Sequence, residues 1–141
     1  MKKRLILKKR NLEEARPILI EMLETSNRCY ALLELGRLEF MARNMDDARN
    51  YLCILLKEGN KRDKYFAKIT LGKIEACCGN IELARTYFNQ LLDSAIENER
   101  SNALLELGRL EFSQGNIDDA KKIFTSLVNS SVSKHSLLCL S

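Results

Sequence analysis

The sequence predicts an all-α protein built from stacked pairs of helices. The ten letters ALLELGRLEF stand at residues 31–40 and again at 103–112. A degenerate copy, AKITLGKIEA, stands midway between them at 67–76. Self-similarity at a period of about 36 residues is typical of repeat architectures in which each unit is one pair of helices. We expect residues 1–141 to form a single domain, because this length is enough to bury a core.

Each predicted unit contains two amphipathic segments. In the first unit, apolar residues recur every three or four positions along 31–38 and again along 45–55, as on one face of a helix. The residues that repeat at the same place in each unit are Gly36, Gly72 and Gly108, then Asn44, Asn80 and Asn116, then Ala48, Ala84 and Ala120. The small residues predict that the two helices of a unit approach closely, with a large residue filling the gap alongside.

The breaks between the two helices are explicit in the sequence. Gly79-Asn80 and Gly115-Asn116 place a Gly where one helix ends and an N-cap Asn where the next begins. Acidic residues follow in the first turn, where the helix dipole favours them. Arg43 stands in place of the Gly in the first unit, which predicts a small loss of stability in that turn.

Both ends of the chain match only part of a unit. Residues 11–24 match a second helix, which leaves residues 1–10 for the first, and residues 134–141 match the start of another first helix. Pro17 predicts a kink or a late helix start near Arg16. The end units match the interior units at a shorter spacing than the interior units match one another. We expect the extra residues of the interior units to lengthen helix ends or loops. The predicted division is a half repeat at 1–28, repeats at 29–64, 65–100 and 101–133, and a terminal half helix at 134–141.

The charge is unevenly distributed along the chain. There are 23 Lys and Arg against 19 Asp and Glu, a net charge of +4. Residues 1–10 hold six of these cations and no acid, which leaves 17 cations against 19 acids in residues 11–141. A mildly acidic body with a basic tip is not typical of proteins that bind polyanions over their whole surface.

The sequence lacks the motifs that mark several functional classes. The apolar run at 5–7 is too short for a signal peptide, and no stretch approaches the roughly 20 apolar residues of a membrane span. The five cysteines lack zinc-ligand spacing, so we expect no metal and reduced thiols in a cytoplasmic protein, with Cys53 and Cys77 packed between helices. Glycine-rich phosphate-binding motifs are absent, and the one histidine is His135, near the end. We therefore expect no enzyme activity and no cofactor.

The spacing of the repeated residues resembles that of the tetratricopeptide repeat family. In each unit a Leu-Gly pair is followed by Ala twelve residues after the Gly, and a large residue stands four positions beyond, as in Phe88 and Phe124. Residues 115–120, GNIDDA, are close to the form that this family uses between its helices. The resemblance covers nearly the whole chain. It implies a right-handed superhelix, or α-solenoid, of antiparallel helix pairs that serves as a protein-interaction scaffold.

The chain departs from the family at one repeated position. Where the family usually has Tyr, this chain has Glu39, Glu75 and Glu111. A second row, of bases, follows the repeated Ala at Arg49, Arg85 and Lys121. A Glu buried alone is costly, so one interpretation is that an acid on the first helix faces a base on the second. The alternative is that both rows are simply solvated.

The family's geometry implies that a partner binds the concave surface made by the first helix of each unit. The implied partner-binding groove is Tyr30, Leu33, Arg37, Phe40, Phe66, Ile69, Lys73, Ala76, Asn102, Leu105, Arg109 and Phe112. Such a groove suits a protein or peptide that carries acids between hydrophobic anchors. Apolar residues replace the Lys of the family's carboxylate-clamp members, so recognition of chaperone tails by that clamp is not expected.

One repeat position carries only cations and predicts a ladder of positive charge. Its members are Arg4, Arg37, Lys73 and Arg109. Glu34 and Glu106 stand one helical turn before two of these arginines and can pair with them. Lys73 has Thr70 at the equivalent place, which predicts that it is the most available cation.

Two other functions remain open. The partial end units predict exposed apolar residues at Leu5, Leu7, Leu137, Leu138 and Leu140, which favour an assembly adaptor that self-associates through its ends. Helical repeats of similar length also include RNA readers, but their Gly and Ala stand in a different register. The acidic body makes nucleic acid the less favoured partner.

Overall fold

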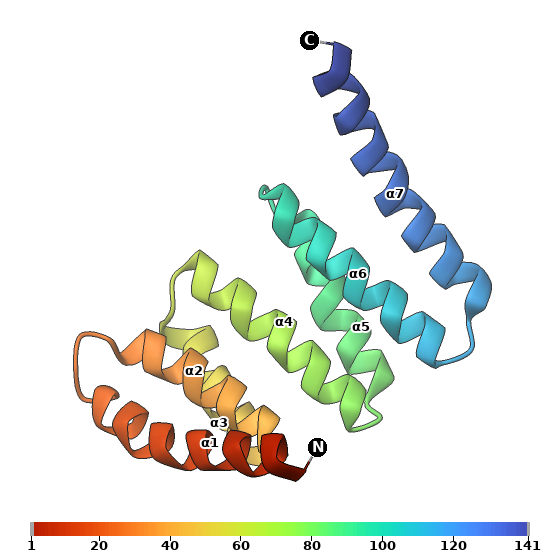
Figure 1. Ribbon diagram of the computed structural model, residues 1–141. Helices are drawn as coiled ribbons and strands as arrows, with labels where there is room; N and C mark the ends of the chain where they lie inside the picture. The colour runs from red at the N-terminus through yellow and green to blue at the C-terminus, as the bar shows by residue number, and fades with distance from the viewer. Residues whose placement is uncertain (1, 141) are drawn as a thin grey trace. The chain divides into compact units, whose positions relative to one another are not determined.

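The computed structural model describes the backbone of residues 2–140 and the side chains of residues 11–129. The described backbone is helical without strands (Figure 1), which confirms the predicted all-α fold class of packed helix pairs. The helices are α1 (Lys2–Met22), α2 (Arg28–Met41), α3 (Met45–Glu58), α4 (Lys61–Cys77), α5 (Ile81–Gln90), the short 3-10 helix η1 (Leu91–Asp93), α6 (Glu97–Ser113) and α7 (Ile117–Leu140). The chain forms two compact units, Met1–Ile74 and Glu75–Ser141.

The turn after α4 shows how one helix ends and the next begins. The N–H of Gly79 donates to the carbonyl of Ala76 at 3.2 Å, and the N–H of Asn80 donates to the carbonyl of Glu75 at 2.8 Å. This pair of bonds is the Schellman motif, which needs a left-handed residue after the helix. Gly79 has φ +84°, and the same bonds recur around Gly115, with φ +82°. The predicted helix breaks are therefore confirmed.

The turn between α2 and α3 has the same hydrogen bonds without a glycine. Arg43 has φ 69°, the left-handed conformation that a side chain disfavours by roughly 1–2 kcal/mol. Asn44 and Asn80 stand at the N-caps of α3 and α5, but their side chains make no capping bond there. The predicted Asn capping is wrong in this respect, because the amide of Asn80 instead donates to Glu75.

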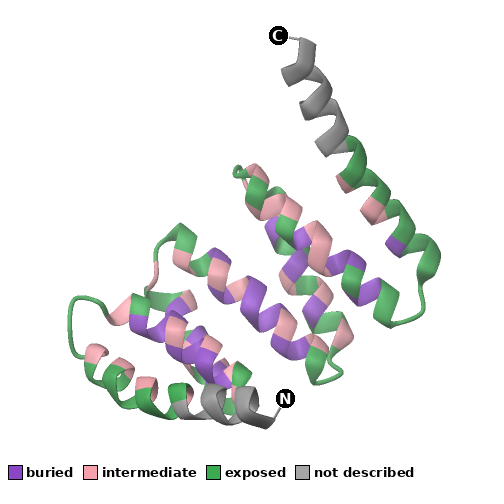
Figure 2. Ribbon diagram, viewed as in Figure 1, coloured by how far each residue is buried: buried purple, intermediate pink, exposed green. Residues whose placement is uncertain are grey.

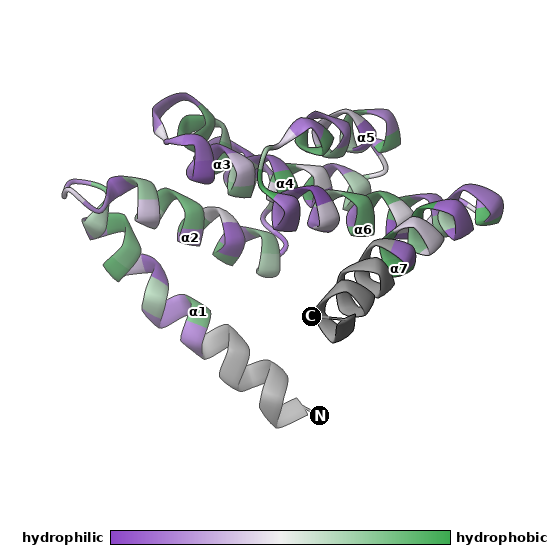
Figure 3. Cartoon of the chain, turned by 90° about the horizontal axis from the view of Figure 1, so that it is seen from above, coloured by the Kyte–Doolittle hydropathy of each residue, from purple (hydrophilic) through white to green (hydrophobic). Residues whose placement is uncertain are grey.

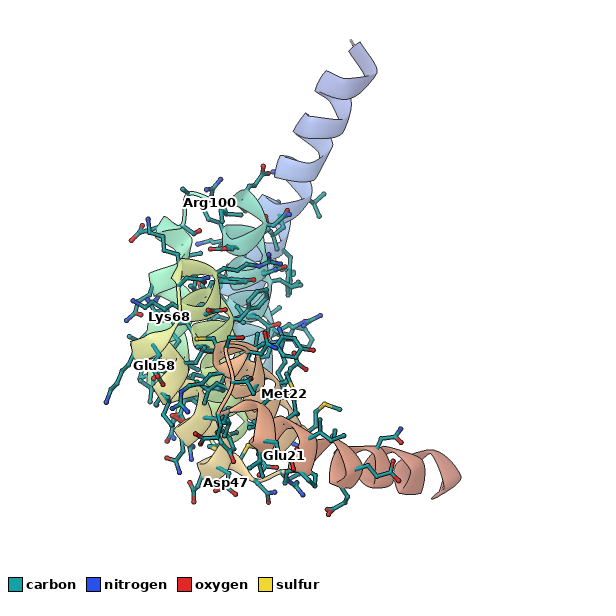
Figure 4. All side chains as sticks on the ribbon, turned by 90° about the vertical axis from the view of Figure 1, so that its left-hand side faces the viewer. Glu21, Met22, Asp47, Glu58, Lys68 and Arg100 are labelled. Carbon is teal, nitrogen blue, oxygen red and sulfur yellow. The ribbon has the colours of Figure 1, made fainter. Side chains whose placement is uncertain are left out.

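The first unit is held together by close packing of α2 on α3. A Cβ placed on Gly36 would lie 2.6 Å from Cγ of Leu52, so the two helices meet without room for a side chain. Leu35 on α2 and Leu55 on α3 are fully buried. Buried residues recur along α2 (Figure 2). At the other end of the pair, Arg28 donates to the carboxylate of Glu58 at 3.1 Å. Glu58 is labelled in Figure 4.

The second unit repeats this packing between α6 and α7. A Cβ on Gly108 would lie 2.5 Å from Cε1 of Phe124. Ala103 and Ala120 are buried in the same pair of helices. Each of these glycines therefore faces the large residue directly, whereas the sequence predicted that the large residue lies alongside a Gly–Ala contact.

The extra residues of the interior period lengthen two helices, as the sequence allowed. The helices α4 and α6 each have 17 residues, whereas α2 has 14. The added turn of α4 begins with a capping box. The N–H of Asp63 donates to Oδ1 of Asn60 at 2.9 Å, and the N–H of Asn60 donates to Oδ2 of Asp63 at 3.2 Å. Hydrophobic and hydrophilic residues are interleaved along α2, α4 and α6 (Figure 3).

The predictions for the chain ends are partly wrong. The helix α1 runs without a break past Asn11 and through Pro17, so neither the break after residue 10 nor the late start near Arg16 occurs. Residues 2–10 have no Gly or Pro to stop a helix, and continuing it avoids a left-handed Arg10. Likewise α7 continues to Leu140 without the break predicted before residue 134. The leucines expected to be exposed at the two ends, and Arg4, lie outside the described side chains.

Candidate partner-binding surface

The predicted groove positions of the first unit lie on α2 and α4 and differ in exposure. The exposed or half-buried ones are Tyr30, Arg37, Phe40, Phe66 and Lys73. Leu33 and Ile69 are buried, at 8% and 7% exposure. Tyr30 is 58% exposed, an unusual position for so large a ring. A partner that approaches this surface therefore meets the aromatic and cationic residues before the aliphatic ones.

Two of the predicted residues come into direct contact across the two helices. The guanidinium carbon of Arg37 on α2 lies 5.1 Å from the centre of the Phe66 ring on α4. The positive group over the negative face of the ring is a cation–π contact. Arg37 also donates through Nη1 to Oε1 of Glu34 at 3.1 Å, the intrahelical pair that the sequence allowed. Arg37 is therefore held in place by two neighbours while 42% of its side chain is exposed.

Sequence reasoning missed a third member of this cluster. The guanidinium carbon of Arg62 lies 5.6 Å from the centre of the same Phe66 ring. Arg62 stands one helical turn before Phe66 on α4, and this spacing was the available signal. The ring is packed on its other neighbour, Tyr65, with centroids 5.0 Å apart at 58°. Because Tyr65 is 7% exposed, it anchors Phe66 to the core.

The prediction that Lys73 is the most available cation is wrong. Lys73 is half-buried and already takes part in a contact of its own. Among the described cations of α2 and α4, Arg62 is the exposed one at the aromatic cluster.

The second unit carries its predicted groove positions on α6. Asn102, Arg109 and Phe112 are exposed, and Leu105 is half-buried. Phe112 is 62% exposed. Arg109 donates to Glu106 at 3.1 Å, as the sequence allowed, but 62% of its side chain is exposed. Asn102 occupies the repeat position of Phe66, so α6 has no aromatic ring at that position.

Glu39, Glu75 and Glu111, here called the acidic row, include two residues that fix neighbouring helices to each other. Glu39 on α2 is 5% exposed, and its Oε1 accepts bonds from Nη2 and Nε of Arg16 on α1 at 2.8 and 3.1 Å. These two bonds to one oxygen raise the pKa of Arg16, with the Glu39 hydrogen bond as the main cause. Arg16 also reaches Glu13 on its own helix at 3.4 Å. The pair therefore joins α1 to α2 in a fixed orientation.

The same arrangement joins α5 to α6 in the second unit. Oε1 of Glu111 accepts from Nε of Arg85 at 2.7 Å, and Oε2 accepts from the Asn116 amide at 2.9 Å. These bonds, led by the one from Arg85, lower the pKa of Glu111 despite its burial. Both acids are therefore paired with a base rather than simply solvated, but the predicted partners are wrong. Each base comes from the helix before the acid, whereas the sequence predicted the second helix of the same unit, with Arg49 for Glu39 and Lys121 for Glu111.

Other features of the described chain do not form a site. An open hollow of about 400 Å³ lies beside α5, α6 and α7. Its wall includes the Arg85–Glu111 pair, whose members bind each other, and the exposed Asp119 and Lys122. No group of three His, Cys, Asp or Glu side chains in the described residues is placed to hold a metal. Cys53 and Cys77 are exposed free thiols, so their predicted packing between helices is wrong. No helix of the described chain is long and apolar enough to cross a membrane.

The packed helix pairs, their Schellman turns and their glycine contacts define a helical repeat protein. Residues 102–131, which span most of α6, its turn and the first part of α7, match the family model described as tetratricopeptide repeat. The resemblance predicted from the sequence is therefore confirmed for this segment, and the helix pairs of the rest of the chain are consistent with it. Comparison with curated proteins finds no match. Such repeats are in general protein-interaction modules and non-enzymatic scaffolds.

Proposed function

We propose that this protein is an interaction scaffold that binds a partner protein or peptide on the first helices of its repeats. In the first unit the binding surface is Tyr30, Arg37 and Phe66, on α2 and α4. In the second unit the equivalent positions on α6 take part, from Asn102 to Phe112. The protein acts by binding and needs no catalytic group, metal or cofactor.

One observation carries this proposal: the contact of Arg37 on α2 with Phe66 on α4. The aliphatic residues beside it are buried, whereas the ring and the guanidinium stay accessible. Aromatic residues and arginine are the side chains enriched at the energetic centres of protein interfaces. Large exposed rings at Tyr30 and Phe112 extend the same character along the repeat positions.

The charge of the surface favours an acidic partner. Arg37 and Arg109 each donate through Nη1 to an acid one turn before them, yet their side chains remain 42% and 62% exposed. An acidic side chain of the partner can therefore reach both guanidinium groups from solvent. The Phe66 ring beside Arg37 provides a contact for a hydrophobic anchor, and both features together suit an acidic peptide with apolar side chains.

The test is capture of partners from native lysate by wild-type protein and by a variant carrying Arg37→Glu and Phe66→Ala. We expect the variant to keep its helical circular dichroism and lose the partner. Lys57→Glu, an equal charge reversal on the exposed side of α3, is the control and should retain it. Undiminished affinity in the folded Arg37→Glu, Phe66→Ala variant would contradict the proposal and move the search to other helices.

A further inference from the structure

The cluster on α2 and α4 has an unusual composition, in that two guanidinium groups from different helices converge on one aromatic ring. Arg37 approaches Phe66 at 5.1 Å and Arg62 approaches it at 5.6 Å. Two cations repel each other, so such a convergence is stabilised by the ring and by any anion that lies between or beside them. We propose that Arg37 and Arg62 bind a phosphorylated side chain of the partner peptide, an inference that rests on the proposed function.

The hydrogen-bond donors of the two arginines are mostly unused. A guanidinium has about five N–H donors in a planar fork. Arg37 directs Nη1 to Glu34, and Arg62 makes no ion pair with any residue whose side chain the structure describes. Arg62 is exposed, so its donors are accessible to a ligand. The cluster is therefore a donor-rich surface with a single acceptor, Glu34, built in.

The charge balance favours a phosphate over a carboxylate. Glu34 already compensates one of the two positive charges, through Arg37. A second carboxylate has two oxygens and one charge, and it satisfies one fork only. A phosphomonoester carries about −1.5 to −2 charges at neutral pH and three acceptor oxygens, so it can accept from both forks at once. Arginine clusters are the usual way in which proteins recognise phosphorylated peptides.

Phe66 prepares the two arginines for this role. Long arginine side chains lose rotamer freedom when they bind, and this loss weakens binding. The ring holds both guanidinium groups near its faces before the ligand arrives, and the buried Tyr65 in turn holds the ring. The second unit lacks this preparation, because Asn98 and Asn102 stand at the repeat positions of Arg62 and Phe66. The phosphate site is therefore a property of the first unit alone.

The test uses four degenerate nonapeptide pools that differ only at a fixed central residue: phosphothreonine, phosphotyrosine, Glu or Thr. Binding is measured by fluorescence anisotropy on the intact chain. We expect at least one phosphorylated pool to bind about tenfold or more tightly than the Glu pool, as two additional charge-assisted bonds imply. Arg62→Gln and Arg37→Gln should each remove most of this preference, and Lys57→Gln should leave it unchanged.

Failure of this proposal can be told apart from failure of the proposed function. If the Glu pool binds as well as both phosphorylated pools, or if the preference survives in the folded Arg62→Gln variant, the phosphate site is refuted. Phosphatase treatment of the lysate gives a second measurement: captured partners should be lost. Partners that are retained after phosphatase but lost with Arg37→Glu and Phe66→Ala would refute the phosphate site and leave the interaction surface standing.

Discussion

Replacing Glu111 by Gln tests the structural role of the buried acidic row. Oε1 of Glu111 accepts from Arg85 at 2.7 Å, and Oε2 accepts from the Asn116 amide at 2.9 Å. A Gln side chain has one oxygen, so whichever way it is turned, its NH₂ group faces one of the two donors. One hydrogen bond is lost and the donor that made it is left against another donor. We expect a loss of about 1.5–3 kcal/mol in the free energy of unfolding, the usual cost for a bond to a charged group.

The matched control is Glu82→Gln, because Glu82 pairs with the same arginine from the surface. Its side chain is 87% exposed, whereas that of Glu111 is 11% exposed. An exposed pair contributes little, so we expect Glu82→Gln to stay within about 0.5 kcal/mol of the parent. Both variants are measured by urea unfolding, and Arg85→Met completes a double-mutant cycle with Glu111→Gln. Equal small effects at Glu82 and Glu111, with no coupling in the cycle, would refute the role assigned to the buried row.

Three further predictions concern stability. Because the pKa of Glu111 is lowered, its stabilising effect is complete above its usual value of 4.5 and is lost as pH falls through the lowered pKa. The difference in free energy of unfolding between the parent and Glu111→Gln, measured by urea unfolding, should therefore shrink in that range and stay constant above it. Gly108→Ala should destabilise by about 1–3 kcal/mol in thermal unfolding, because its Cβ would meet Phe124 at 2.5 Å, and Phe124→Leu in the same chain should recover part of the loss. Arg43→Gly should stabilise by about 1 kcal/mol and Gly115→Arg should destabilise by a similar amount, because both positions are left-handed; equal signs in denaturant titrations would contradict this.

Most of the fold is predictable because the repeated residues each favour one local conformation. Gly79 and Gly115 end helices because only a left-handed residue closes the Schellman turn, and the period identifies Arg43 as the third such position. The ends were mispredicted because a match in sequence was taken to indicate a turn. Asn11 matches Asn44 in sequence, but a similar residue does not end a helix unless the packing of the next helix requires the turn.

The candidate site was only partly predictable. The repeat register placed Arg37 and Phe66 on the same surface, and their contact agrees with it. Arg62 was missed because its position has no counterpart of the same kind in the other units. The partners of the acidic row were assigned to the wrong helix, because a period gives the spacing of a row and not the neighbour that each member meets. The packing of α1 on α2 brings Glu39 to Arg16, and the period does not contain this information.

Site-specific photo-crosslinking at Tyr30 tests the central claim most directly. The photoreactive amino acid p-benzoylphenylalanine resembles the tyrosine that it replaces, and Tyr30 is 58% exposed on α2. The control places the same group at Ile54, which is 37% exposed on α3. With a captured partner present, we predict a covalent adduct from position 30 and none from position 54. An adduct from position 54 alone would show that the partner binds the second helices and would contradict the assigned surface.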